Sequence, residues 1–125
     1  MLEIRKITDD KIIESLKSEC AIDFHADFAG VFEGGKVIEF AAYSIIDEYV
    51  NVHHISYNTK DFALIDGLIK TLIFYADLVK ARYLILEPEY ERFAKAFNFE
   101  RNGNNFILDI YKQNKTCNCD CRKDD

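Results

Sequence analysis

The pattern of hydrophobic and polar positions predicts four strands and one short helix in the first half of the chain. Leu2–Ile7 alternates apolar and charged residues, which is typical of a strand with one buried face. Thr8 offers a hydroxyl N-cap to a helix that ends near Ser18. The other strand-like runs are Phe28–Phe32, Lys36–Ile46 and Tyr49–Tyr57. Glycines in the Glu33-Gly34-Gly35 segment predict a tight hairpin, so these three runs form an antiparallel meander.

In the second half of the chain, the apolar residues recur with a period of about 3.6 residues. Phe62–Ala81 is the longest predicted helix and so apolar that it must lie against a sheet. Arg82–Leu86 is nearly all apolar, as expected of a strand buried on both faces. These two segments and Tyr49–Tyr57 therefore predict a βαβ unit with a right-handed crossover. A third helix follows at Glu89–Phe97, and a closing hairpin is formed by Phe99–Asn102 and Asn105–Tyr111.

Composition narrows the class of protein. The chain has 125 residues, 49% of them hydrophobic, and a formal net charge of −6. We expect one domain over residues 1–111, followed by a polar tail over residues 112–125. The hydrophobic content excludes an intrinsically disordered chain, and the acidic balance argues against a nucleic-acid partner. No apolar run is long enough to cross a bilayer and the first residues are not a signal peptide, so we expect no membrane association and a cytoplasmic location.

The predicted order β α β β β α β α β β resembles the GNAT-type N-acetyltransferase superfamily over residues 2–111. The segments that carry the resemblance are VFEGGKVIEFAAY, VNVHHISY, LIDGLIKTLIFYA and RFAKAFNFERNGNNFILDI. The resemblance implies an α+β fold, with a central mixed, mostly antiparallel sheet and helices on both faces. It also implies acetyl-CoA as co-substrate and a small-molecule or peptide amine as acceptor, with a homodimer as a candidate assembly.

The family's pyrophosphate loop, Gln/Arg-x-x-Gly-x-Gly/Ala, falls on Lys60–Ile65. Lys60 keeps the positive charge and Ala63 is small, whereas Ile65 replaces the second small residue and Asp61 adds negative charge. Backbone amides before a helix bind phosphate, because the helix dipole favours an anion there. The residues implied in acyl-CoA binding are Ile55, Ser56, Tyr57, Lys60, Phe62, Ala63, Leu64 and Ile65. The alternative is that Phe62–Ile65 is only the core-facing first turn of the helix.

The acid and base of the family have weak counterparts here. Ala94 stands where members often have a tyrosine that protonates the leaving thiolate, and Tyr90 lies one turn earlier. His53 and His54 fall on the strand that often carries a base, and imidazole has a suitable pKa. Strand alternation predicts that they point to opposite faces, so at most one enters the cleft. Either histidine could instead be an ordinary packing residue.

Other polar residues leave two interpretations open. His25, with Asp23 and Asp27, lines an acceptor pocket for a cationic amine or belongs to a solvated loop. Glu39 lies in a strand where the superfamily often has glycine, and faces either the acceptor or solvent.

Three cysteines at alternate positions, Cys117, Cys119 and Cys121, occupy the tail. Their thiolates could bind one soft ion such as Zn²⁺, with a fourth ligand from elsewhere. The alternative is a reduced, exposed tail.

The sequence therefore favours an N-acetyltransferase that moves an acyl group from acyl-CoA to an amine. The alternative is a non-catalytic GNAT-fold protein that binds a ligand or partner through a degenerate CoA site.

Overall fold

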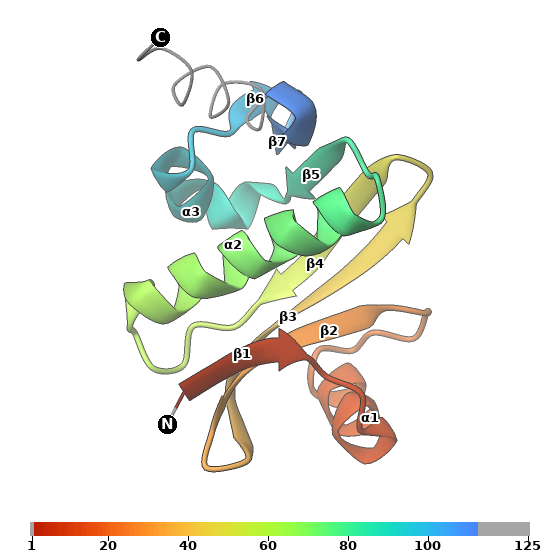
Figure 1. Ribbon diagram of the computed structural model, residues 1–125, viewed down its shortest axis with the longest axis vertical. Coiled ribbons are helices and arrows are strands. Elements are labelled where there is room, and N and C mark those ends of the chain that lie inside the picture. The colour runs from red at the N-terminus through yellow and green to blue at the C-terminus, as the bar shows by residue number, and fades with distance from the viewer. Residues whose placement is uncertain (1, 113–125) are drawn as a thin grey trace, which may run out of the picture.

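The computed structural model describes residues 2–112 of the chain. Helices and strands follow one another in the predicted order (Figure 1). The elements are β1 (Leu2–Lys6), α1 (Asp10–Glu19), β2 (Asp27–Glu33), β3 (Lys36–Ile46), β4 (Tyr49–Ile55), α2 (Phe62–Leu78), β5 (Tyr83–Leu86), the 3-10 helix η1 (Pro88–Tyr90), α3 (Glu91–Ala96), β6 (Glu100–Asn102) and β7 (Asn105–Asp109).

The strands form one seven-stranded sheet in the order β1-β2-β3-β4-β5-β7-β6. Neighbouring strands are antiparallel except β4 and β5, which are parallel and joined through α2. This arrangement confirms the predicted meander, the βαβ unit and the mixed, mostly antiparallel sheet.

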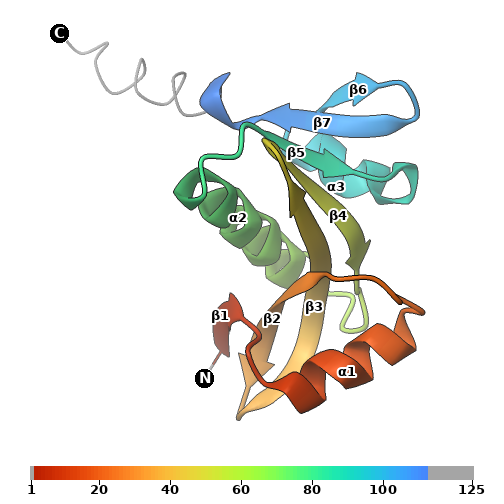
Figure 2. The ribbon, with the colours of Figure 1, turned by 90° about the vertical axis from the view of Figure 1, so that its right-hand side faces the viewer.

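Helices cover both faces of the sheet, as predicted. On one face, α2 and α3 share a core with β4, β5 and β7 that includes Leu68, Leu84 and Phe93. On the other face, α1 packs on β2 and β3 around Phe28 and Phe40. Figure 2 shows α1 and α2 on opposite sides of β2 and β3. The α1-side core contains residues of β2 and β3 but none of β4 or β5. Tyr83 and Ile85, which alternate with the core residues of β5, are half-buried.

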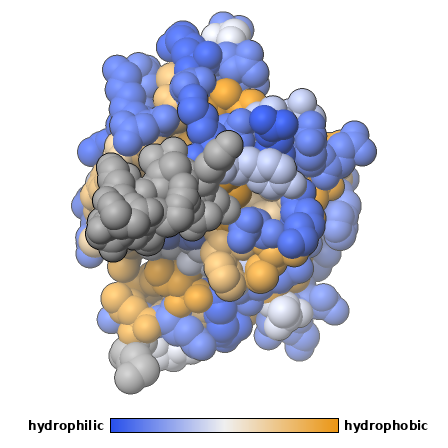
Figure 3. Space-filling view, turned by 45° about the horizontal axis from the view of Figure 1, so that its top comes forward, coloured by the Kyte–Doolittle hydropathy of each residue, from blue (hydrophilic) through white to orange (hydrophobic). Residues whose placement is uncertain are grey.

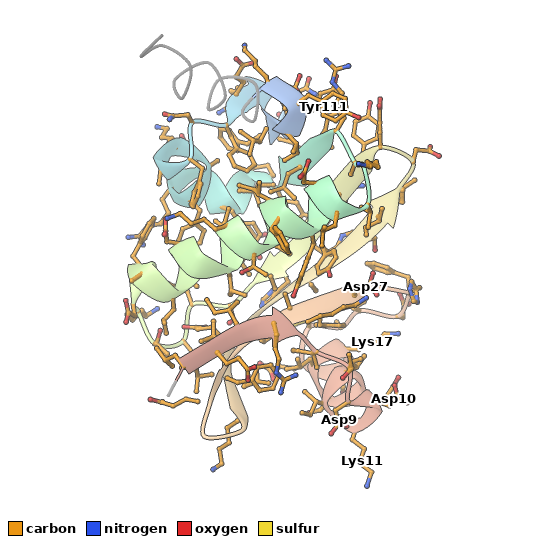
Figure 4. All side chains as sticks on the ribbon, viewed as in Figure 1. Asp9, Asp10, Lys11, Lys17, Asp27 and Tyr111 are labelled. Atoms are coloured by element: carbon orange, nitrogen blue, oxygen red, sulfur yellow. The ribbon has the colours of Figure 1, made fainter. Side chains whose placement is uncertain are left out.

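Three local predictions need correction. Asp9, rather than Thr8, caps α1, because its carboxylate accepts the Lys11 N–H at 2.9 Å; Figure 4 shows Asp9 at the start of this helix. Helix α2 ends at Leu78, short of the predicted Ala81, because Lys80 adopts a φ of +63°. The predicted helix Glu89–Phe97 is divided into η1 and α3.

The surface is mainly polar on the face drawn in Figure 3, where apolar residues form separate patches. Several large apolar side chains are exposed, among them Phe74 and Leu78 on α2 and Ile46 on β3. No helix within residues 2–112 has the length and apolar character needed to cross a membrane.

Candidate functional site

The centre of the candidate site is the place where β4 and β5 separate. The two strands pair from Tyr49 and Tyr83 up to Val52 and Leu86. Beyond this point β4 continues to Ile55, while the chain after β5 turns into η1. Because the strands no longer pair there, backbone groups at the end of β4 are free to bond to something other than β5.

Tyr90 of η1 reaches into this opening. Its side chain is buried, and its hydroxyl oxygen accepts the Ile55 N–H at 3.0 Å. Burial raises the pKa of Tyr90 to about 12, and nearby Glu89 and Glu87 act in the same direction, although the Ile55 hydrogen bond lowers it. The phenol is therefore protonated at neutral pH. Ala94, where the family often has its tyrosine, is completely buried in the core of α3.

His53 and His54 lie on the same face of the sheet, and the prediction of opposite faces is wrong. The β3–β4 register shifts between Ala42 and Tyr43, which pair with His54 and Val52 and leave His53 as an extra residue. Such a bulge interrupts the alternation of side chains. His54 stacks on Phe40, a residue of the α1-side core, with ring centroids 5.2 Å apart.

His53 is held by a defined hydrogen bond. Its Nε2 lies 2.9 Å from Ser44 Oγ, and the Ser44 hydroxyl itself donates to the His25 carbonyl oxygen at 3.0 Å. Because the hydroxyl hydrogen is used, Ser44 Oγ accepts from His53, which places the imidazole proton on Nε2 and leaves the lone pair on Nδ1. Burial lowers the pKa of His53 below its ordinary value of 6.5, so the ring is neutral at pH 7.

Two hollows share His53 in their lining. One has a volume of about 240 Å³ and is lined by Asn51, Val52, His53, Ile85, Glu87, Pro88 and Asn105. The other, of about 360 Å³, is lined by Phe24, His25, Asp27, Ser44, Ile45, Ile46 and His53. Each hollow therefore contains one carboxylate. Burial raises the pKa of Glu87, as does the Glu89 charge, whereas His54 lowers it.

Of the three residues predicted to line an acceptor pocket, two lie together in the structure. His25 and Asp27 share the second hollow, where His25 Nε2 lies 3.9 Å from Asp27 Oδ1. Asp27 also lies 3.9 Å from Lys6 Nζ, on β1. Asp23 is not among the residues that line this hollow.

Glu39 does not face solvent, so the solvent-facing interpretation of this residue is wrong. Its side chain is completely buried. The carboxylate accepts hydrogen bonds from the loop between β4 and α2, namely from the Ser56 hydroxyl, the Asn58 N–H at 3.0 Å, and the Thr59 N–H and hydroxyl at 2.7 and 2.6 Å. Burial alone would raise the pKa of Glu39, but these hydrogen bonds outweigh it and lower the pKa.

The start of α2 fits a phosphate group only in part. The helix begins at Phe62, and Lys60 beside it has a positive φ of 59°, with Nζ 5.3 Å from the centre of the Tyr57 ring. Asp61 is the N-cap, and its carboxylate accepts the Ala63 N–H at 3.0 Å. A negative charge of the chain itself therefore lies where the helix dipole would attract a phosphate. The Ile65 side chain is completely buried, and Leu64 is half-buried.

Aromatic rings join this loop to α3. Phe93 lies 5.6 Å from the Tyr57 ring and 5.4 Å from the Phe62 ring, measured between centroids. The Arg92 guanidinium lies 5.2 Å from the centre of the Tyr57 ring. Lys60 and Arg92 thus both lie near the Tyr57 ring, in the loop before α2.

The predicted metal ligands Cys117, Cys119 and Cys121 lie outside the described residues. Over residues 2–112, no group of three or more His, Cys, Asp and Glu side chains is arranged to hold a metal ion.

The sequence predicted some of this site and missed other parts of it. Ile55 and Tyr90 meet at the opening between β4 and β5. His53 lines a hollow with Glu87 and Pro88, and Ser56–Ile65 includes the loop after β4 and the start of α2. The roles of Ser44, Glu87 and Glu39 were missed. A glutamate within the apolar segment VIEFAAY was the available signal for Glu39, whereas its partners lie 17 to 20 residues further along the chain.

Comparison with known proteins identifies the fold. The sequence matches no family model and no curated protein. The structure is similar to the ribosomal-protein-S18-alanine N-acetyltransferase of Escherichia coli (TM-score 0.71, 12% identity, covering 88% of this chain and 94% of that one). It is also similar to a probable acetyltransferase of Staphylococcus epidermidis (TM-score 0.67, 13% identity, covering 87% and 99%).

A third similar structure is a GNAT-family N-acetyltransferase of Escherichia coli in complex with CoA (TM-score 0.60, 14% identity, covering 87% of this chain and 81% of that one). Together with the sheet order and the separation of β4 from β5, these similarities confirm the fold expected from the sequence. The chain therefore has the fold of the GNAT-type N-acetyltransferases.

Proposed function

We propose that this protein is an acyl-CoA-dependent N-acyltransferase whose chemistry takes place where β4 and β5 separate. The observation that carries the proposal is the hydrogen bond from the Ile55 N–H to the buried Tyr90 hydroxyl. It places a backbone donor and a protonated phenol together, inside a fold that several acetyltransferases share.

These two groups match the two charges that develop in acyl transfer. Attack of an amine on a thioester forms a C–N bond, moves charge onto the carbonyl oxygen and then breaks the C–S bond. The Ile55 N–H is a donor for the carbonyl oxygen, once it exchanges its bond with Tyr90. The Tyr90 hydroxyl hydrogen, which the bond with Ile55 does not use, is a donor for the thiolate.

His53 is the group best placed to take the proton from the amine. It is neutral at pH 7, its tautomer is fixed by Ser44, and it borders both hollows. His54 is the alternative base, because it lies on the same face of the sheet. Glu87 and Asp27, one in each hollow, favour a cationic amine as acceptor, either a small molecule or the amine of a peptide.

The CoA moiety is assigned to the loop and first turn of α2. Residues available to it are Lys60 and Arg92 for the phosphates, the amides of Phe62–Ile65, and the backbone of Ile55–Tyr57 along β4. Asp61 opposes phosphate binding there, because its carboxylate already accepts the Ala63 N–H.

The Asp61 carboxylate at the start of α2 favours a second candidate, a GNAT-fold protein that binds a ligand without turnover. In this case Asp61 and Ala94 are the traces of a lost catalytic site, and the Tyr90–Ile55 bond is only a structural contact.

One experiment separates the two candidates. Acetyl-CoA binding is measured by calorimetry, and CoA release in the presence of a panel of diamines, amino acids and peptides is followed by chromatography. Chromatography is preferable to thiol reagents, because the chain has four cysteines of its own. Binding with amine-dependent CoA release supports the transferase, and binding without release supports the second candidate. Absence of binding at millimolar acetyl-CoA would contradict the transferase and favour the second candidate.

A further inference from the structure

Glu39 is a buried carboxylate with an unusual set of partners. Its two oxygens accept four hydrogen bonds, all from the three residues Ser56, Asn58 and Thr59. Within residues 2–112, no lysine, arginine or histidine forms an ion pair with it. Burial of an unpaired charge is costly unless hydrogen bonds satisfy it. The loop therefore satisfies Glu39, and Glu39 in turn fixes the loop.

The loop that Glu39 binds is also bonded to β3 and to the start of α2. Ser56 also bonds to β3 through its backbone and side chain, since its N–H donates to the Phe40 carbonyl and its Oγ accepts the Phe40 N–H, both at 2.9 Å. Thr59 Oγ1 accepts the Asp61 N–H at 3.2 Å, which connects Glu39 through Thr59 to the N-cap of α2. One carboxylate thus links β3, the end of β4 and the first turn of α2.

We propose that Glu39 is a positioning residue for acyl-CoA, which holds the loop Ser56–Thr59 in its binding conformation before the ligand arrives. This inference rests on the proposed function. The Glu39 carboxylate occupies the Asn58 and Thr59 amides as an anion would, so that the ligand's phosphates are received at Lys60 and the helix start beyond it. Without Glu39, binding must also order the loop, and affinity falls by that cost.

The variant Glu39→Gln tests this directly. A carboxamide has one acceptor oxygen, so its NH₂ group would face one of the two backbone N–H donors that the carboxylate now binds. Loss of one hydrogen bond to a charged group predicts a roughly tenfold higher Kd for acetyl-CoA. The kcat of the bound complex should change less than twofold, because Glu39 does not touch the atoms that we assign to the reaction.

Two further variants make the result specific. Thr59→Val removes the hydroxyl bond to Glu39 together with the bond from the Asp61 N–H, and it keeps the buried charge. It serves if Glu39→Gln does not fold, and it should also raise the Kd for acetyl-CoA, by a smaller factor. Asp9→Ala is the matched control, because it removes a carboxylate that accepts two backbone N–H groups at the start of α1, away from the loop. It should leave the Kd for acetyl-CoA unchanged.

Amide hydrogen exchange without ligand provides a readout independent of catalysis. In Glu39→Gln, the Asn58 and Thr59 amides should exchange at least about tenfold faster. The Lys11 amide, bonded to Asp9 at the start of α1, is the internal reference and should not change. Faster exchange with a higher Kd supports the inference. Unchanged exchange, or faster exchange with the Kd of the unaltered chain, would overturn it while leaving the proposed function standing. Failure of the unaltered chain to bind acetyl-CoA would overturn both.

Discussion

Replacing Tyr90 with phenylalanine is the substitution that bears most directly on the candidate site. The change removes one oxygen atom and leaves the ring packed, so its main effect is to deprive the buried Ile55 N–H of its acceptor. A buried donor without a partner costs about 1–3 kcal/mol of stability. For a chain of this length, we expect Tm to fall by roughly 4 °C for each kcal/mol.

Chemical denaturation of the unaltered chain and the variant measures this loss. Tyr43→Phe is the matched control, because Tyr43 is also a buried tyrosine of the same core and its hydroxyl is not the acceptor of the Ile55 N–H. The control should lose less than about 0.5 kcal/mol. An equal loss in both variants would show that the Tyr90–Ile55 bond contributes nothing specific.

The same variant tests whether the Ile55 N–H serves the acyl carbonyl. Acetyl-CoA has a thioester carbonyl to offer this donor, whereas CoA has none. Saturating acetyl-CoA should therefore restore more of the lost stability than CoA does, by about 1 kcal/mol, the worth of one hydrogen bond. Equal effects of the two ligands would refute the assignment of Ile55 as the carbonyl donor.

Two other substitutions test the base and the helix start. Burial lowers the pKa of His53, so the fall of kcat/KM on the acid side should occur below pH 6.5. This fall should disappear in His53→Gln and persist in His54→Gln. The opposite result would identify His54 as the base. Asp61→Asn keeps a capping oxygen but removes the negative charge at the start of α2, so acetyl-CoA should bind roughly two- to fivefold more tightly. The control Asp9→Asn, at the start of α1, should leave the Kd for acetyl-CoA unchanged. An unchanged Kd in Asp61→Asn, measured by calorimetry, would argue against phosphate binding at this helix.

The sequence carried enough information to predict the fold. Local periodicity is strong in β3, whose bounds Lys36–Ile46 were predicted without error, and in α2, whose start at Phe62 was also correct. The end of α2 was missed because lysine rarely adopts the left-handed conformation that Lys80 has here, so its presence in the sequence does not predict a helix end. The division of the later helix into η1 and α3 was also missed.

The site was harder to predict because its geometry depends on contacts between distant segments. A single extra residue in β4 brings His53 to the face that His54 occupies, and strand alternation gives no sign of it. The role of Glu39 depends on hydrogen bonds to residues 17 to 20 positions away. Asp61 was recognised as a departure from the family's loop, but its bond to Ala63 required the backbone geometry of the helix start.

Backbone amide chemical shifts during a titration with acetyl-CoA test the central claim most directly. If acyl-CoA binds where β4 and β5 separate, the Ile55, Lys60 and Ala63 amides should shift in a saturable manner, while the Ile12 amide at the start of α1 stays unchanged. CoA should shift Lys60 and Ala63 but have a smaller effect on Ile55, since it lacks the carbonyl. Saturable shifts confined to other parts of the chain, or none at millimolar acetyl-CoA, would contradict the proposed site.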